Sequence, residues 1–405
     1  MKRFRILHIV LFLWIAIGIL FSLSKLENLV HLDSLDYLES QSSDTLDTFV
    51  PITSAEPVED SATDSTFASF FAALRQAKTQ AVRVVHFGDS QIEQDRITMT
   101  LRHHWQQQYG GCGLGLIPVL QTVPTYTLAQ SLSMNGSEVS SGNGPRRYFV
   151  YGLRSLRREE NNRYGVMGQV LVMNDSLVSG SEHLMLTLHP YAYRDRQFTR
   201  LRLWADSSIT ITREDTTVYL DGKGDVYGLS MESETGVYVD NIPMRGCSGT
   251  MFTNISEEQL TEYFRQTNTR LIIMQYGGNA LPNVEEHKNI SKTVRQLGQQ
   301  IRYLRRCAPE ATILFIGPSD MLINDHGTMV SNPMVPYMDH QLQLLAKREG
   351  IAYWSLYKVM GGEGSMVQWQ EQGLAGDDGI HFTKKGADLV AEELINYLEN
   401  LDKLE

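Results

Sequence analysis

The sequence is poor in the residues and motifs that mark several other classes of protein. Its three cysteines, Cys112, Cys247 and Cys307, are too few and too scattered for a disulfide framework or a structural zinc site, so at most one disulfide can form. Acidic residues outnumber basic ones by 47 to 36, and the net charge of -11 argues against nucleic acid as a partner, because phosphate backbones need clustered Lys and Arg. The glycine-rich stretch at 110–115 lacks Gly-Lys-Ser/Thr and is not a phosphate-binding loop. We therefore expect neither a metal ion nor another cofactor.

The first 26 residues have the pattern of a segment that directs export. Lys2, Arg3 and Arg5 precede an apolar run at residues 6–23. That run is short for a membrane-spanning helix and long for the core of a signal peptide, and no clear Ala-x-Ala cleavage site follows it. We interpret residues 1–26 as an uncleaved signal anchor that inserts into a membrane; a cleaved signal peptide is the alternative. The positive charges before the run place the rest of the chain on the far side of the membrane.

Residues 27–64 are predicted to be a flexible, solvated linker. They are rich in Ser, Thr, Asp and Glu and have no lasting apolar period. A helix is then predicted to begin at Asp64 or Ser65, since either can cap it. Its apolar face consists of Phe67, Phe70, Phe71 and Leu74.

Two parts of the chain, 65–120 and 241–405, alternate between predicted strands and helices. Residues 82–87 read as a buried strand, and the helix after it carries Ile97, Leu101 and Trp105 on one face. The later elements are a helix capped by Ser256, a strand at 271–276, a long helix around 290–304, a strand at 312–316, a helix at 336–348, a strand at 351–354 and a last helix from Lys384. Such alternation predicts one α/β domain with a parallel, doubly wound sheet.

Residues 121–240 have a different character and predict a β-sandwich inserted into that domain. They contain short alternating segments, such as 184–188, 208–212 and 237–240, which are separated by polar turns.

Four short motifs occur in an order that points to chemistry. Gly88-Asp89-Ser90 follows the first predicted strand, where open α/β sheets place their active sites, but a tripeptide is a weak signal alone. Three further motifs follow it: Gly246-Cys-Ser-Gly249-Thr before a helix, Gly277-Gly-Asn279 after a strand, and Asp378-Gly-Ile-His381 before the final helix.

Together these motifs resemble the four sequence blocks of the SGNH (GDSL) hydrolase superfamily. The resemblance implies a three-layer α/β/α, flavodoxin-like domain. The run His86-Phe-Gly-Asp-Ser-Gln-Ile-Glu-Gln-Asp95, followed by Gly-x-Gly-Leu-Ile-Pro118, looks like the opening of bacterial peptidoglycan O-acetylesterases, in which a carbohydrate-binding-like β-sandwich lies between the Ser and Gly blocks. Two departures are Gly-Gly-Asn279-Ala in the Asn block and Gln91 where His is frequent in that group.

The chemistry implied is attack on an ester by an activated hydroxyl. A neutral His381 can take the proton of Ser90 and return it to the leaving alcohol, while Asp378 holds the imidazole in the right tautomer. The Ser90 amide, the Gly249 amide and the Asn279 side chain can form the oxyanion hole.

Alternatives remain for several of these residues. Gly246 competes with Gly249 for the oxyanion role, and Asn279 can be a loop cap. Asp89 is expected to make structural hydrogen bonds beneath Ser90. Cys112 and Cys247 can form a disulfide or remain two thiols.

The predicted function is removal of O-acetyl or other short acyl groups from an acetylated polysaccharide, above all peptidoglycan. An O-acyltransferase would use the same triad, and a lipid esterase or a non-catalytic glycan-binding protein are further alternatives. The expected location is the bacterial cell envelope, with the chain anchored in the inner membrane and the catalytic domain in the periplasm.

Overall fold

The computed structural model describes residues 67–134, 137–139, 145–151, 163–173, 182–281 and 287–404. The signal anchor at 1–26, the linker at 27–64 and the proposed caps Asp64 and Ser65 lie outside these residues. Within the described ranges no helix is both long and apolar enough to cross a membrane. The described residues belong to one compact unit, 56–405.

A five-stranded parallel sheet forms the centre of the α/β part. Its strands run in the order β12 (Gly236–Pro243), β1 (Ala81–Gly88), β13 (Thr269–Gln275), β14 (Thr312–Ile316) and β17 (Ala352–Trp354). Branched and other apolar side chains that are buried on both faces explain why these segments form central strands. The parallel sheet predicted from the alternating pattern is confirmed.

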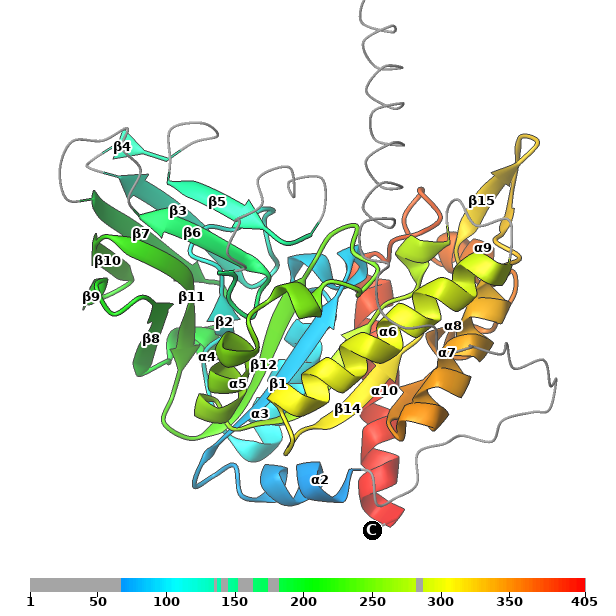
Figure 1. The fold of residues 1–405 in the computed structure, drawn as a ribbon, viewed down its shortest axis with the longest axis horizontal. Helices are drawn as coiled ribbons and strands as arrows, with labels where there is room; N and C mark the ends of the chain where they lie inside the picture. Colours follow the sequence, from blue (N-terminus) through cyan, green and yellow to red (C-terminus); the bar gives the residue numbers. More distant parts are fainter. Residues whose placement is uncertain are drawn as a thin grey trace, which may run out of the picture. The chain divides into compact units, whose positions relative to one another are not determined.

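Helices cover both faces of this sheet (Figure 1). Val85 and Phe87 of β1 share an apolar cluster with α5 (Glu257–Gln266), α6 (His287–Cys307) and α7 (Val335–Glu349). Val82 and Val84 share the opposite cluster with α2 (Ala68–Arg75), α3 (Thr98–Tyr109), α8 (Leu356–Met360), α9 (Ser365–Glu371) and α10 (Lys384–Leu404). The two clusters make three α/β/α layers, as the fold class predicted.

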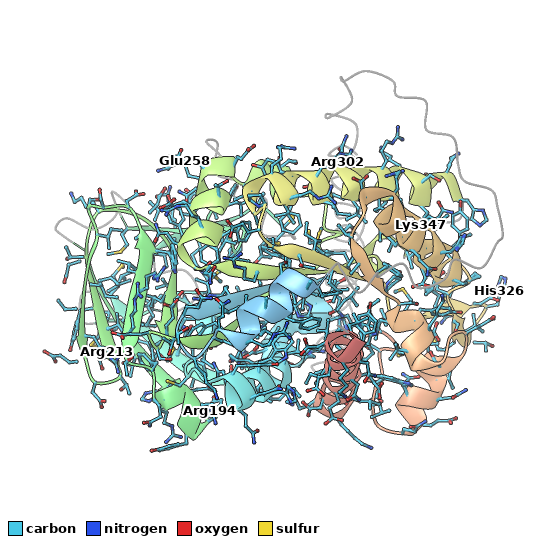
Figure 2. The ribbon with its side chains drawn as sticks, turned by 90° about the horizontal axis from the view of Figure 1, so that it is seen from below. Arg194, Arg213, Glu258, Arg302, His326 and Lys347 are labelled. Atoms are coloured by element: carbon cyan, nitrogen blue, oxygen red, sulfur yellow. The ribbon has the colours of Figure 1, made fainter. Side chains whose placement is uncertain are left out.

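The helices follow the apolar stripes in the sequence. In α6 the buried positions include Ile290, Val294, Leu297, Ile301 and Leu304, which recur with the helical period. Its outer face, and that of α7, carry exposed charged residues such as Arg302 and Lys347, which point outward in Figure 2. Ser256 caps α5 by accepting a hydrogen bond from the Gln259 amide. The described part of the first helix begins at Ala68, with Phe67 at its cap.

Between β1 and β12 the chain forms two sheets built of antiparallel pairs. One has the order β4-β3-β7-β10-β9, and the other has the order β2-β11-β6-β5 with β8 also paired to β11. Their strands are β2 Gly115–Ile117, β3 Leu128–Met134, β4 Ser137–Glu138, β5 Arg146–Phe149, β6 Gln169–Met173, β7 Glu182–Pro190, β8 Arg200–Ala205, β9 Thr210–Glu214, β10 Thr217–Gly222 and β11 Gly224–Glu232. Apolar residues of both sheets form one cluster. That this region is an independent carbohydrate-binding-like domain stays a prediction.

One predicted strand of the insertion belongs elsewhere. Residues 237–240 lie in β12, which pairs with β1 at the edge of the central sheet and not with the antiparallel strands. The misleading signal is the alternation of Val with polar residues. Asp240 is nevertheless fully buried, because Arg83 donates a 2.7 Å hydrogen bond to it and the Leu116 amide donates one of 2.8 Å. In the sequence, a buried and ion-paired Asp240 therefore cannot be distinguished from a polar residue that faces solvent.

Candidate active site

Ser90, His381 and Asp378 lie in one line of hydrogen bonds. Ser90 Oγ is 2.7 Å from His381 Nε2, and His381 Nδ1 is 2.7 Å from Asp378 Oδ2. Because a carboxylate oxygen only accepts hydrogen bonds, Nδ1 carries the proton and Nε2 is free to accept from the Ser90 hydroxyl. The structure therefore brings together the three residues predicted to form a triad, although they are up to 291 positions apart in the chain.

A tight loop before α10 holds Asp378 and His381. Asp378 Oδ1 accepts hydrogen bonds of 2.9 Å from the amides of Ile380 and His381, which leaves Oδ2 for the imidazole. Gly379 has φ +66°, and a Cβ on it would lie 2.8 Å from Leu322 Cβ, so a larger residue is strained there. The loop thus holds the side chains of Asp378 and His381 in contact with each other.

The pKa of Asp378 is lowered. Partial burial acts to raise it, but hydrogen bonds from the His381 side chain and from the amides of His381 and Ile380 outweigh burial. The carboxylate therefore stays ionised and can hold the imidazole tautomer and stabilise its protonated form.

Ser90 sits at the carboxyl end of β1 and opens the short 3₁₀ segment η2 (Ser90–Asp95). Below it, the buried Asp89 accepts hydrogen bonds from the Gln91 amide (2.9 Å) and from Asn279 Nδ2 (2.8 Å). Burial raises the pKa of Asp89 to about 6 despite these hydrogen bonds. These hydrogen bonds agree with the structural role expected for Asp89 beneath the nucleophile.

Gln91 ties the nucleophile segment to the His381 loop. Its Nε2 donates to Ile380 O at 2.6 Å and to Ser319 Oγ at 3.3 Å, and its Oε1 accepts from Phe382 N at 3.4 Å. These contacts hold the backbone on both sides of His381. Arg96 adds a 2.9 Å hydrogen bond from Nη1 to Phe382 O.

No pattern in the sequence predicts this contact between segments. Gln91 stands out in the sequence only as a departure from the resembling enzymes, and Arg96 belongs to none of the four motifs. Their partners lie almost 300 residues further along the chain, so no local pattern connects them.

Two of the predicted oxyanion donors, Asn279 and Gly249, have hydrogen-bond partners inside the protein. Asn279 Nδ2 donates to Asp89 Oδ2 and, at 3.3 Å, to Cys247 O, while the Gly249 amide donates to Cys247 Sγ at 3.3 Å. Sulfur accepts hydrogen bonds weakly, so a charged oxyanion would be the better acceptor for the Gly249 amide. Gly249 is buried and Gly246 is exposed.

Three further histidines close to the motifs in the sequence have partners other than the residues of this line of hydrogen bonds. His86 is buried and pairs with Gln275 Oε1 at 3.0 Å, and burial lowers its pKa to about 4. His103 contacts Asp195, and His104 contacts Glu399 of α10. Each is thus a packing or surface residue.

All three cysteines are free thiols, so the disulfide considered between Cys112 and Cys247 is not formed. Gly111 packs against Gly236 at the amino end of β12, where a Cβ on Gly236 would lie 2.2 Å from Gly111 Cα. Cys112 is therefore at the amino end of β12, whereas Cys247 follows its carboxyl end. Burial raises the pKa of Cys247 to about 12, which keeps it a neutral thiol.

Residues 207–389 match the model of the GDSL-like lipase/acylhydrolase family. The matched residues make up somewhat less than half of the chain, and over them the chain is similar to the GDSL-like hydrolases. This match supports a carboxylic ester hydrolase. The matched range contains Gly249, Asn279, Asp378 and His381, whereas Ser90 precedes it.

Comparison with solved structures gives one match that shows the fold and two weaker ones that align with less than half of this chain. One titled "Peptidoglycan O-acetylesterase in action, 5 min" superposes with a TM-score of 0.67 at 21% identity and covers 86% of this chain and 99% of its own. The lipopolysaccharide acetyltransferase periplasmic domain of Salmonella ser. Paratyphi A has a TM-score of 0.29, 14% identity and coverage of 41% and 73%. An acetyl xylan esterase has a TM-score of 0.28, 13% identity and coverage of 40% and 80%. No curated protein matches the chain.

Proposed function

We propose that this GDSL-like hydrolase is a serine esterase that removes O-acetyl groups from a cell-envelope polysaccharide, with peptidoglycan as the substrate. The observation that carries the proposal is the pair of 2.7 Å contacts that joins Ser90, His381 and Asp378. A serine hydroxyl is weakly nucleophilic until a neighbouring base accepts its proton, and this arrangement supplies both the base and the group that orients it.

In the proposed reaction Ser90 Oγ attacks the carbonyl carbon of the acetyl ester while its proton passes to His381 Nε2. The C–O bond to the sugar then breaks, and the imidazolium returns the proton to the departing sugar oxygen. A water molecule, deprotonated by His381, next attacks the carbonyl carbon of acetyl-Ser90. The bond from that carbon to Ser90 Oγ breaks, acetate leaves, and His381 returns the proton to Oγ. Asp378 stays ionised throughout, in keeping with its lowered pKa.

The Ser90 amide, the Gly249 amide and Asn279 Nδ2 are proposed to stabilise the tetrahedral oxyanion. In the absence of substrate the last two donate to Cys247 Sγ and to Asp89 and Cys247 O. The developing negative charge would compete for these donors, and such donors act most strongly where charge appears only in the transition state.

The choice of peptidoglycan rests on two supports. The solved structure with a TM-score of 0.67, which aligns over 86% of this chain, is titled as a peptidoglycan O-acetylesterase. The sequence pattern of residues 1–26 favours a position in the cell envelope. We propose that this segment anchors the chain in the inner membrane, with the catalytic part in the periplasm.

The test is release of acetate from O-acetylated peptidoglycan by the purified full chain and by Ser90→Ala. We expect the wild-type chain to release acetate and Ser90→Ala to release none above background. O-acetylated xylan and aryl esters of increasing acyl length serve as comparison substrates. Activity confined to long-chain esters, or equal activity of the two proteins, would overturn the proposal.

A further inference from the structure

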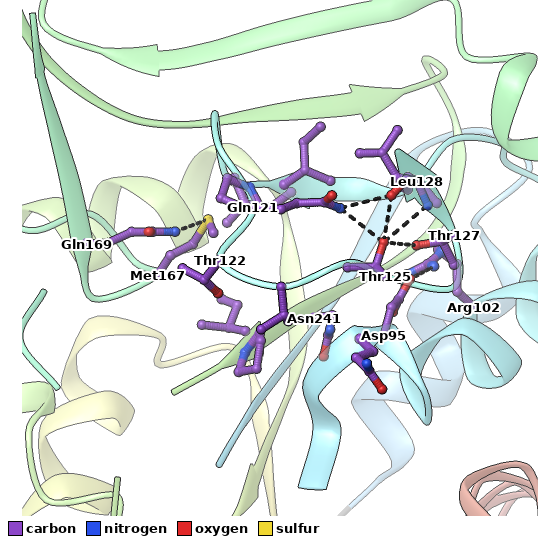
Figure 3. Close-up of a pocket in the computed structure, with 18 of the residues that line it drawn as sticks. Asp95, Arg102, Gln121, Thr122, Thr125, Thr127, Leu128, Met167, Gln169 and Asn241 are labelled. Carbon is purple, nitrogen blue, oxygen red and sulfur yellow. Dashed lines mark hydrogen bonds and ion pairs between the residues drawn. The ribbon is translucent and has the colours of Figure 1, made fainter. Parts of the chain in front are cut away.

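A cavity that opens to solvent lies beside the nucleophile segment (Figure 3). One wall comes from Gln94 and Asp95 of η2 and from the carboxyl end of β12 at 241–243; the other comes from residues 114–128 and 167–169 of the antiparallel sheets. Pro243 pairs with Gly88, which is two residues before Ser90. The cavity therefore lies along the sheet edge where Ser90 emerges, which is where α/β sheets bind ligands.

The lining of the cavity carries no free charge. Its two charged residues, Asp95 and Arg102, form an ion pair with each other, and Arg102 also donates to Val239 O at 3.0 Å. An anionic or cationic ligand would find no counter-charge there. The ligand that fits is therefore an uncharged one.

The remaining lining combines apolar walls with amides and hydroxyls. Ile117, Met167 and Ile242 supply apolar surface, and Thr122 and Gln169 supply polar groups. Gln169 is only 8% exposed, and its Nε2 has Met167 Sδ at 3.9 Å as its partner, which is a weak acceptor. Such a buried amide donor would gain by meeting a carbonyl or hydroxyl oxygen of a ligand.

The cavity wall and the nucleophile belong to one short segment. Gln94 and Asp95 have φ values of +64° and +62°, a costly conformation for residues other than glycine. The Tyr126 amide, from the antiparallel part, donates to Gln94 O at 3.0 Å, and Asp95 pairs with Arg102. A ligand in the cavity would thus lie against the same six residues that carry Ser90.

We infer that this cavity binds an uncharged 2-acetamido sugar of the glycan strand, next to the sugar whose acetyl ester reacts at Ser90. The methyl of an acetamido group suits the apolar wall, and its N–H and C=O suit the amides. The inference rests on the proposed function and gives that site a binding position for the polymer.

The test is a binding measurement that needs no ester chemistry. Full-length Ser90→Ala is titrated with N-acetylglucosamine tetramer and with cellotetraose, which lacks the acetamido groups, and binding is followed by calorimetry. We expect the N-acetylglucosamine tetramer to bind at least about tenfold more tightly than cellotetraose, because a tenfold difference in affinity corresponds to the net contribution of one to two good hydrogen bonds. Thr122→Phe, which fills the cavity, should weaken that binding by a similar factor. Thr212→Phe, on the exposed strand β9, is the matched control and should not.

Gln169→Leu keeps the inference open to test if Thr122→Phe fails to fold. Absence of binding, equal binding of both sugars, or binding unchanged by both cavity variants would overturn it. These results can be told apart from a failure of the proposed function, because that function is tested by acetate release, by its dependence on Ser90 and by its dependence on acyl length, and not by sugar binding.

Discussion

Gln91 Nε2 donates a 2.6 Å hydrogen bond to the carbonyl oxygen of Ile380, the residue before His381. The same side chain accepts from the amide of Phe382, the residue after it. The neighbour of the nucleophile thus positions the loop of the proposed base, although it lies outside the triad.

Gln91→Met should lower kcat for a short aryl acetate by about 10-fold to 100-fold, because small errors in the placement of a base are costly. KM should change little, since Gln91 is not placed against the substrate. Gln91→His, which keeps one N–H donor, should retain more activity and a pH profile nearer that of the wild type. The control is Gln372→Met, because Gln372 is an exposed glutamine in the segment between α9 and α10 that also contains His381. Equal, small effects of Gln91→Met and Gln372→Met on kcat would show that the contact has no positioning role.

His381→Ala and Asp378→Asn should each lower turnover of an aryl acetate by about 1,000-fold or more, because triad members act as a unit. Asp378→Asn replaces an acceptor with an amide that favours the wrong imidazole tautomer. Circular dichroism and melting temperature should be close to wild type, since both side chains are partly exposed. A variant that folds and keeps most of its activity would remove that residue from the mechanism.

Asn279→Ala should lower kcat by about 100-fold to 1,000-fold, which is the usual cost of one oxyanion donor. The measurement is kcat against KM for the same aryl acetate, and the loss should appear in kcat. Asn268→Ala removes a structural hydrogen bond to Ala81 O and serves as the control. If the two variants lose the same small factor, Asn279 acts only as the partner of Asp89.

The raised pKa of Asp89 predicts a pH dependence of stability. The folded protein binds this proton up to pH about 6, whereas the unfolded chain releases it near the ordinary value of 3.8. The Asp89 contribution to the free energy of unfolding should therefore be complete below pH 3.8 and decline as pH rises to about 6, by about 3 kcal/mol. Asp89→Asn should lack this component, so the difference between the two proteins in urea titrations should vary over that interval. A difference independent of pH would contradict the raised pKa.

Removal of residues 1–30 should give a soluble protein with unchanged activity on aryl acetate, because the predicted linker after the anchor carries no apolar face. The full chain should sediment with membranes, and the truncated form should remain in the supernatant. A mature protein whose N-terminus begins beyond Leu23 would identify the segment as a cleaved signal peptide.

Local patterns in the sequence are sufficient to predict the layered α/β fold and to locate the four motifs. Buried strands such as β13 and β14 appear in the sequence as short continuous apolar runs, and α6 appears as an apolar stripe with the helical period. Both signals depend on local spacing alone. Asp378 and His381 could be paired for the same reason, since three residues on one turn place both side chains together.

Features that depend on contacts between distant segments could not be predicted from local patterns and are known from the folded chain. The assignment of β12 to the central sheet follows from pairing with β1 and from the burial of Asp240 against Arg83, neither of which a local alternating pattern can reveal. The Gln91–Ile380 contact, the separation of Cys112 from Cys247, and the cavity between η2 and the antiparallel sheets have the same origin. In each case the partners lie far apart in the chain, and the packing of separate elements brings them together or keeps them apart.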